Sequence, residues 1–222
     1  MTCVALAIAL LVLGVGGCGN GDDAGSAESP PKPVGAAQEP EPADAEARVL
    51  WPAPQRQLER TVAAGLEPER KEHLTHHVHA HLDVFVDGGP IAVPAGIGIN
   101  SDDPEVRRFD EPDGSIAFGG IKHCRTPCIS PLHTHDATGI LHTESATLEQ
   151  NTLGQFFTEW GVPLSQSCVG KYCAPETIAV YVNGEPYTED PRAIKLTDRK
   201  EIAIVIGTPP PKIPKTADFS NA

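Results

Sequence analysis

The most regular feature of the chain is an alternation of apolar and polar residues over positions 78–86. Successive side chains of a β-strand point to opposite faces, so this alternation predicts a strand with one apolar and one polar face. The polar face carries three histidines and an aspartate, namely His77, His79, His81 and Asp83. The turn sequence DGGP at 87–90 and the apolar stretch 91–99 then predict a return strand, and therefore a hairpin.

Helical spacing of apolar residues predicts two helices. Leu58, Val62 and Leu66 recur every four residues, which predicts a short amphipathic helix. The stretch 152–161 predicts a second helix, because it begins with the capping-box pattern T-x-x-Q and ends with a glycine.

Three further strands are expected after the hairpin. The sequence GILHTES predicts a short strand on which Ile140, His142 and Glu144 share one face. The alternating stretches 177–184 and 195–207 each end in turn residues and predict a C-terminal strand pair.

This order of elements predicts an α+β domain with a small mixed sheet, one capped helix and a C-terminal strand pair. The arrangement loosely resembles a β-grasp. We place the domain at residues 49–207 and expect a loop over 101–120. The proline-rich end of the chain, 208–222, is predicted to be disordered.

The first 17 residues have the pattern of a signal peptide. They are apolar from Cys3 to Val15, a run shorter than the roughly 20 residues that a membrane span needs. The sequence VGGC at 15–18 resembles a bacterial lipobox, in which the peptide is cut before a cysteine that then carries acyl chains such as palmitate. This resemblance implies a lipidated Cys18 and a chain anchored at the extracytoplasmic face of the cell membrane.

Residues 18–48 are expected to form a disordered tether between the lipid and the domain. After Cys18 this stretch has seven acidic residues against Lys32 and Arg48, and it contains no aromatic residue. Such a composition cannot bury enough apolar surface to fold. The formal net charge of −13 for the whole chain also argues against a nucleic-acid partner.

Export to an oxidising compartment favours disulfide bonds among the remaining cysteines. Apart from Cys3 and Cys18, the chain has four, namely Cys124, Cys128, Cys168 and Cys173. Local pairing would close two short loops, whereas a crossed pairing would join two distant loops. The spacing of the cysteines leaves these alternatives open.

The strongest candidate chemistry is a cluster of histidines. All nine lie between His73 and His142, and two His-x-His segments are each tied to a predicted strand. If the segments meet across one sheet, three or four imidazoles can hold one copper or zinc ion. The predicted ligand pool is His77, His79, His81, His133, His135 and His142. Asp83, Asp136 and Glu144 are expected to bind the ion as well, or to orient a ligand ring.

Three functions are compatible with such a cluster. We favour metal handling, meaning delivery to an extracytoplasmic protein partner, buffering or sensing, over catalysis. A metalloenzyme would use three histidines and an open position for water, with Glu144 or Asp136 as base. A metal-free module would use the histidines as a pH-responsive binding surface.

Several motifs together resemble a family of secreted or membrane-anchored proteins from actinobacteria and their relatives. The matching stretches are HVHAHLDVFVDG, SPLHTHDATGILHTES, TLGQFFTEWGV and VYVNG, which occur in this order between Leu74 and Ile206. The resemblance implies export and similar domain limits, but no particular reaction. The spacing of CRTPC at 124–128 is similar to that of thioredoxin-like copper chaperones, but two prolines interrupt the helix that should follow it.

Overall fold

The computed structural model describes residues 47–146 and 150–220. The chain divides into two units, 1–41 and 42–222, and all the described residues belong to the second. The expected signal peptide, the lipidation site and most of the expected tether lie outside the described residues. Within the described part of the chain, no helix is long and apolar enough to cross a membrane.

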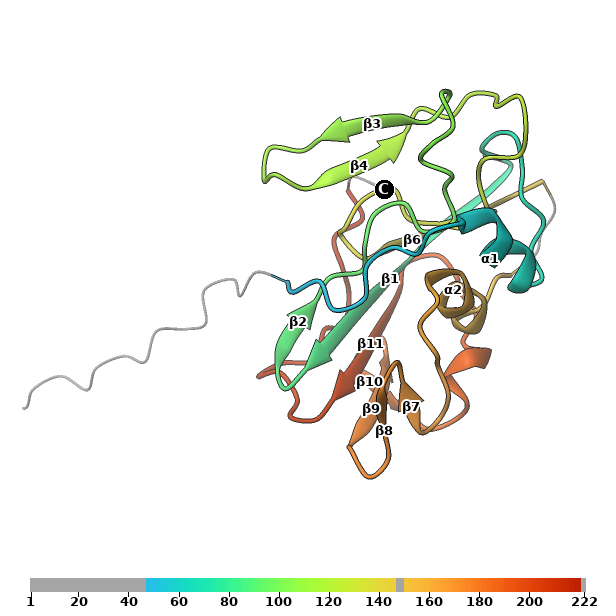
Figure 1. The fold of residues 1–222 in the computed structure, drawn as a ribbon. Coiled ribbons are helices and arrows are strands. Elements are labelled where there is room, and N and C mark those ends of the chain that lie inside the picture. Colours follow the sequence, from blue (N-terminus) through green and yellow to red (C-terminus); the bar gives the residue numbers. More distant parts are fainter. Residues whose placement is uncertain (1–46, 147–149, 221–222) are drawn as a thin grey trace, which may run out of the picture. The chain divides into compact units, whose positions relative to one another are not determined.

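One mixed sheet, of seven strands among the described residues, forms the centre of the domain (Figure 1). Its strands are β1 (His76–Val86), β2 (Gly89–Ile91), β5 (Leu132–His133), β6 (Ile140–Ser145), β9 (Ile178–Val182), β10 (Glu185–Tyr187) and β11 (Lys200–Ile206). The strand order is β10-β9-β11-β1-β6-β5, and β2 also pairs with β1. β1 is parallel to β11, and the other described pairs of this sheet are antiparallel. The predicted α+β class with a mixed sheet is confirmed.

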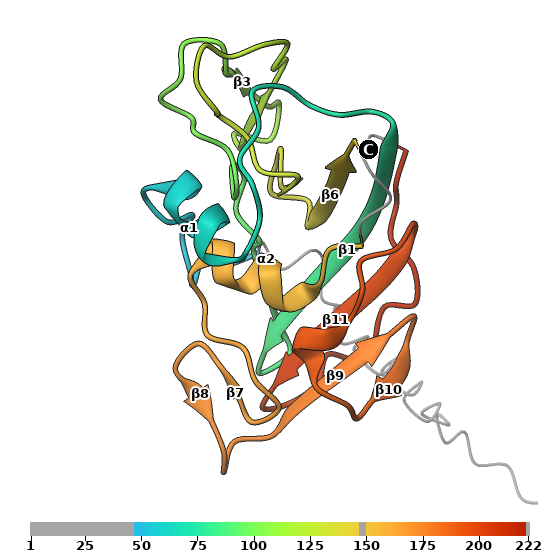
Figure 2. The same ribbon diagram turned by 90° about the vertical axis from the view of Figure 1, so that its right-hand side faces the viewer.

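Helix α2 (Leu153–Trp160) packs against one face of this sheet (Figure 2). The predicted capping box of Thr152 and Gln155 is present, and Gly161 ends the helix with a positive φ of 78°. The aromatic side chains of α2 are buried in one cluster with the even-numbered residues of β1 from Ala80 to Val86. The apolar face predicted for β1 is therefore the core face, and its odd-numbered histidines lie on the opposite face.

Helix α1 (Gln57–Ala63) forms where a helix was predicted, but it buries a different face. Val62 is 62% exposed, whereas Thr61 is fully buried. Thr61 Oγ1 donates a hydrogen bond of 2.7 Å to Oε1 of Glu159 on α2. Burial raises the pKa of the Glu159 carboxyl group to about 8. A polar contact between the two helices thus sets the orientation of α1, and apolar spacing does not reveal it.

Two stretches between the main strands differ from the prediction. The apolar stretch 91–99 contributes only its first residue to β2, and the rest is loop around Pro94, which cannot donate to a ladder. The expected loop 101–120 contains a hairpin of β3 (Arg107–Asp110) and β4 (Ile116–Gly119) in a separate sheet. All four residues of β3 are exposed, so no apolar alternation marks this strand.

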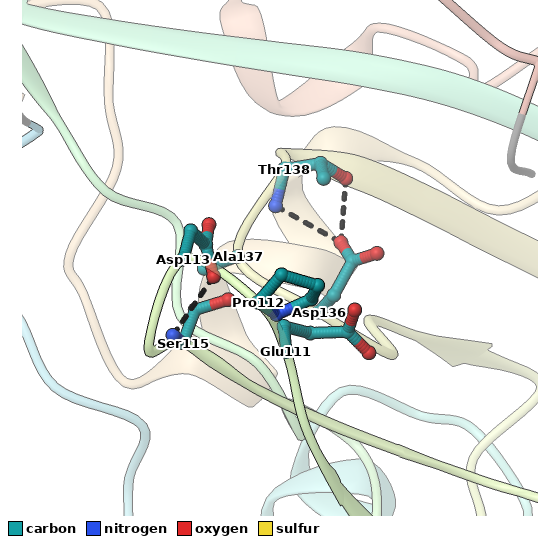
Figure 3. Close-up of a pocket in the computed structure, with 7 residues that line it drawn as sticks. All are labelled: Glu111, Pro112, Asp113, Ser115, Asp136, Ala137 and Thr138. Atoms are coloured by element: carbon teal, nitrogen blue, oxygen red, sulfur yellow. Dashed lines mark hydrogen bonds between the residues drawn. The ribbon is translucent and has the colours of Figure 1, made fainter.

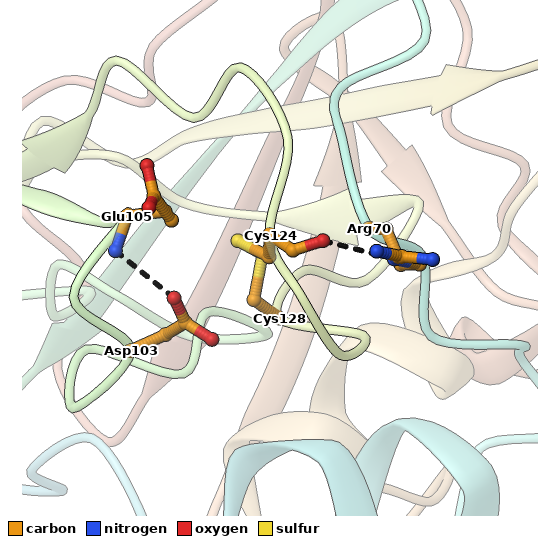
Figure 4. Close-up of a disulfide and its surroundings, with 5 residues drawn as sticks. All are labelled: Arg70, Asp103, Glu105, Cys124 and Cys128. Atoms are coloured by element: carbon orange, nitrogen blue, oxygen red, sulfur yellow. Dashed lines mark hydrogen bonds between the residues drawn. A yellow bond between two sulfur atoms is a disulfide. The ribbon is translucent and has the colours of Figure 1, made fainter.

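Both disulfides join cysteines that are close in the sequence, so the local alternative is the correct one. Cys124 pairs with Cys128 in a loop, where Arg70 Nε donates a hydrogen bond of 2.9 Å to the carbonyl oxygen of Cys124 (Figure 4). Cys168 pairs with Cys173 across the small hairpin of β7 (Cys168–Val169) and β8 (Tyr172–Cys173). These four cysteines therefore supply no thiolate ligand.

The two ends of the described chain lie against the domain. Arg48 forms a parallel bridge with Ile91, one residue before the predicted start of the domain. Residues 208–220, expected to be disordered, contain no helix or strand, and Thr208 N donates a hydrogen bond to Asp87 Oδ1 in the turn between β1 and β2. A 3₁₀ turn at Pro191–Ala193 completes the elements of the described residues.

Candidate metal centre

Strand pairing brings the two histidine segments together. His79 on β1 lies directly opposite His142 on β6, and His77 lies opposite Glu144. His133 on β5 lies opposite His142 from the other side. Residues directly opposite each other in antiparallel strands point to the same face, so these side chains gather on the face away from α2. The predicted convergence of the two segments is confirmed.

An inner group of four side chains surrounds one point on this face. One ligand atom from each of His133, His135, His142 and Glu144 lies within 4.8 Å of the others. The Nε2 atoms of His133 and His135 are 3.2 Å apart, and His133 Nε2 is 3.7 Å from Glu144 Oε1. His133 is fully buried and Glu144 is 3% exposed. The inner group therefore presents imidazole and carboxylate ligand atoms in a space almost closed to solvent.

Backbone carbonyl groups fix which nitrogen of two inner rings is free to bind. His133 Nδ1 donates to the carbonyl oxygen of Ser130 at 2.9 Å, and His135 Nδ1 donates to that of Phe118 at 2.6 Å. A carbonyl oxygen only accepts, so each Nδ1 carries the proton and each neutral ring has its lone pair on Nε2. Two lone pairs then face each other, an arrangement that a bound cation stabilises. A backbone hydrogen bond of this kind also orients imidazole ligands in metal sites.

An outer group of three histidines overlaps with the inner group. Ligand atoms of His77, His79 and His142 also lie within 4.8 Å of one another. His77 Nε2 is 2.8 Å from His79 Nε2, 3.4 Å from His142 Nδ1 and 3.1 Å from Glu144 Oε1. The His142 ring lies between the others, with its centroid 4.5–5.7 Å from those of His77, His79, His133 and His135. The two groups thus form one continuous cluster that runs from an exposed edge to a buried interior.

Burial favours the neutral form of four of these imidazoles. It holds the pKa of His133 well below the ordinary value of 6.5, and neighbouring histidines lower it further. The pKa of His142 is lowered by the same two causes, in the same order. Burial also lowers the pKa values of His77 and His79. Neutral imidazole is the form that binds metal ions, so protons compete weakly with a metal for these nitrogens.

Glu144 has the opposite shift. Burial, and then the negative charge of Glu72, raise the pKa of Glu144 to about 8. Its Oε2 atom accepts no hydrogen bond from the described residues. Glu72, which we did not predict as a site residue, places Oε1 3.9 Å from His135 Nε2. A buried carboxyl group with these surroundings is one that a bound cation would ionise.

His81 and Asp83, predicted as ligands of the same ion, form a separate group. Their partner is Glu201 on β11, which sequence reasoning missed. His81 Nδ1 lies 3.0 Å from Glu201 Oε2 and 3.8 Å from Asp83 Oδ2. Glu201 follows Lys200 at the charged start of β11, ahead of five apolar residues, so the sequence pattern does not mark it as a site residue. Burial raises the pKa of Asp83 to about 6; the charge of His81 opposes this rise, and the charge of Glu201 adds to it.

Asp136 is outside all three groups. Its Oδ1 atom accepts hydrogen bonds from the backbone nitrogen and the hydroxyl group of Thr138, at 2.9 and 2.5 Å (Figure 3). It thereby closes a turn beside an acidic pocket of about 780 Å³ that is also lined by Glu111 and Asp113. Asp136 therefore shapes the loop between β5 and β6 rather than contacting the inner histidines.

Comparisons with known proteins add no family to this description. No protein-family model, curated protein or solved structure matches the chain. The described residues nevertheless contain buried groups of histidine and glutamate that could hold a metal ion, and function has to be argued from this geometry.

Proposed function

We propose that this chain binds one divalent transition-metal ion, zinc or copper, through His133, His135, His142 and Glu144. The observation that carries this proposal is the opposed pair of Nε2 atoms on His133 and His135, both fixed by backbone carbonyl groups. Structural hydrogen bonding would place a donor opposite an acceptor at this point. An ion is the partner that satisfies two acceptors at once.

The spacing of the ligand atoms supports zinc. Zinc binds nitrogen at about 2.0–2.1 Å in a tetrahedron, which puts neighbouring ligand atoms about 3.3 Å apart. The distance between the Nε2 atoms of His133 and His135 is 3.2 Å, close to this value, and His133 Nε2 is 3.7 Å from Glu144 Oε1. Copper(II) prefers a planar arrangement with shorter edges but binds imidazole more tightly, so both metals belong in the test.

The overlap of the two groups supports metal handling. His142 belongs to both the inner and the outer group, so an ion held by His77 and His79 at the exposed edge would need only to exchange ligands around His142 to reach the interior. A chain that collects, buffers or hands over an ion needs such a path between solvent and the tight site. The lipobox-like sequence ending at Cys18 supports the same role at the outer surface of a cell membrane, as a lipoprotein that exchanges metal with an extracytoplasmic partner.

Metal content tests the binding site directly. The purified full chain is loaded with zinc or with copper(II), dialysed at neutral pH and analysed for bound metal. We expect His133→Gln and His142→Gln each to lose one equivalent relative to the unsubstituted chain. His76→Gln is the matched control, because His76 lies on β1 next to His77 but belongs to none of the three groups. Unchanged metal content in both ligand variants would refute the proposal.

Exchange kinetics test the proposed role in metal handling. His79→Gln is expected to keep the inner ion but to slow its transfer to a chelator, since the outer path is broken. An unchanged transfer rate would remove the argument for metal handling.

Lipid labelling tests the proposed membrane anchor. Cys18→Ala is expected to abolish incorporation of labelled palmitate and to release the chain from the membrane fraction. Retained label would contradict lipidation at Cys18.

A further inference from the structure

A third group of ligand side chains lies apart from the histidine cluster, between β1 and β11. We propose that His81, Asp83 and Glu201 bind a second divalent cation through one imidazole nitrogen and two carboxylate groups. This group shares no residue with the inner or the outer group. His81 also lies two residues from His79 on an extended strand, about 7 Å along it. Metal binding at the second site therefore does not depend on metal binding at the first.

The register of the two parallel strands creates this group. His81 pairs with Glu201, and Asp83 follows on the same face of β1. His81 Nδ1 is 3.0 Å from Glu201 Oε2, and ligand atoms of all three residues lie within 4.8 Å of one another. Two bonds of about 2.0–2.2 Å from one ion span up to about 4.4 Å, so the distances of 3.0 and 3.8 Å from His81 Nδ1 to the two carboxylates fit one ion.

Glu201 has the most deeply buried carboxylate of the three residues. Its exposed fraction is 0%, and neither carboxylate oxygen accepts a well-formed hydrogen bond from the described residues. His81 is the one basic side chain in the described part of the chain that forms an ion pair with it. The nearby Arg199 directs its guanidinium group to the ring of Phe219 instead, 5.7 Å from the ring centroid. His81 is therefore the one side chain among the described residues that compensates this buried charge, and incomplete compensation of a buried carboxylate is destabilising.

The ring of His81 is held in the tautomer that a metal ligand requires. Its Nε2 atom donates to the carbonyl oxygen of Thr138 at 2.8 Å, so in the neutral ring the lone pair lies on Nδ1 and faces Glu201. Asp136 fixes Thr138 by the two hydrogen bonds described above. Gly139 lets this loop approach β1, because a Cβ atom there would lie 3.0 Å from His81 Nε2. The loop residues thus orient Nδ1 toward the two carboxylates.

Charge balance favours a divalent ion over a proton in this position. A proton on His81 supplies one positive charge against two carboxylate groups, which leaves one negative charge without a partner of opposite sign. A divalent ion with neutral His81 balances both. Two oxygen ligands and one nitrogen ligand suit zinc or manganese(II), whereas the imidazole-rich first site favours zinc or copper.

Counting bound zinc in matched variants tests the second site. The full chain is equilibrated with zinc by dialysis, and each variant is checked for folding by circular dichroism. We expect about two equivalents in the unsubstituted chain and one fewer in Glu201→Gln and in Asp83→Asn. The Asp83 side chain is 29% exposed, so Asp83→Asn keeps the test valid if Glu201→Gln fails to fold. The exposed Glu185 provides the control Glu185→Gln, which should bind as much zinc as the unsubstituted chain.

The outcomes separate the two sites. His142→Gln should lose the other equivalent and keep the one that depends on Glu201. If Asp83→Asn and Glu201→Gln bind as much zinc as the unsubstituted chain, the second site is refuted while the first can stand. If His142→Gln loses nothing but the acidic variants lose one equivalent, the second site stands and the function proposed above fails.

Discussion

The buried Glu159 makes the stability of the fold depend on pH in a way that one substitution removes. Its carboxyl group lies between α1 and α2, where Thr61 donates to Oε1 while Oε2 accepts no hydrogen bond from the described residues. Glu159→Gln keeps the shape of the side chain and the oxygen atom that accepts the hydrogen bond from Thr61, but it cannot ionise. We therefore expect the variant to be more stable than the unsubstituted chain at alkaline pH, and similar to it at acid pH.

The size of the effect follows from the raised pKa. The pKa of Glu159 is about 8 in the folded chain, against an ordinary value of 4.5. The folded state therefore keeps a proton that the unfolded state releases between these values, and stability falls as pH rises through this window. Each pKa unit corresponds to 1.36 kcal/mol, so between pH 5 and pH 8 Glu159 lowers the free energy of unfolding by about 3.5 kcal/mol.

Urea unfolding of the metal-free chain at pH 5 and pH 8 measures this difference. Comparing the variant with the unsubstituted chain cancels the contribution of Glu144, whose pKa is also raised to about 8. We expect the advantage of Glu159→Gln to grow by about 3.5 kcal/mol from pH 5 to pH 8. An advantage that is the same at both pH values would refute the reasoning that burial raises this pKa.

Two further predictions follow from other contacts. Because the pKa of Glu144 is about 8 in the metal-free chain, its ionisation should contribute about one proton to those released when zinc binds at pH 7. Calorimetry in two buffers of different ionisation enthalpy measures the number of protons released. An equal number released by Glu144→Gln would contradict the prediction. Thr152→Ala should cost about 1 kcal/mol in urea unfolding, since it removes the cap of α2. The exposed Thr158→Ala should cost less, and equal losses would count against the capping argument.

Side-chain alternation predicted the faces of the strands well, because it depends only on the local geometry of an extended chain. The odd-numbered histidines of β1 and the pair His142 and Glu144 on β6 lie on the predicted faces. Pairing and register depend on the whole fold, and the sequence does not encode them locally. For this reason it could not show that Glu201 would lie beside His81, or that Asp136 would turn away from the other ligands.

A polar contact in the interior explains why the prediction of the buried face of α1 was wrong. The four-residue spacing assigned Val62 to the buried face of α1, whereas the hydrogen bond of Thr61 to Glu159 rotates that helix. Here a partner distant in the sequence outweighs the local pattern of apolar residues.

A crystal structure of the full chain loaded with zinc, with anomalous diffraction at the zinc edge, tests the central claim most directly. We predict an anomalous peak about 2.0–2.1 Å from the Nε2 atoms of both His133 and His135, with His142 and Glu144 completing the coordination. A zinc-loaded crystal with no peak between these two nitrogens, or with zinc bound only at surface carboxylates, would contradict the assignment of this cluster as a metal centre.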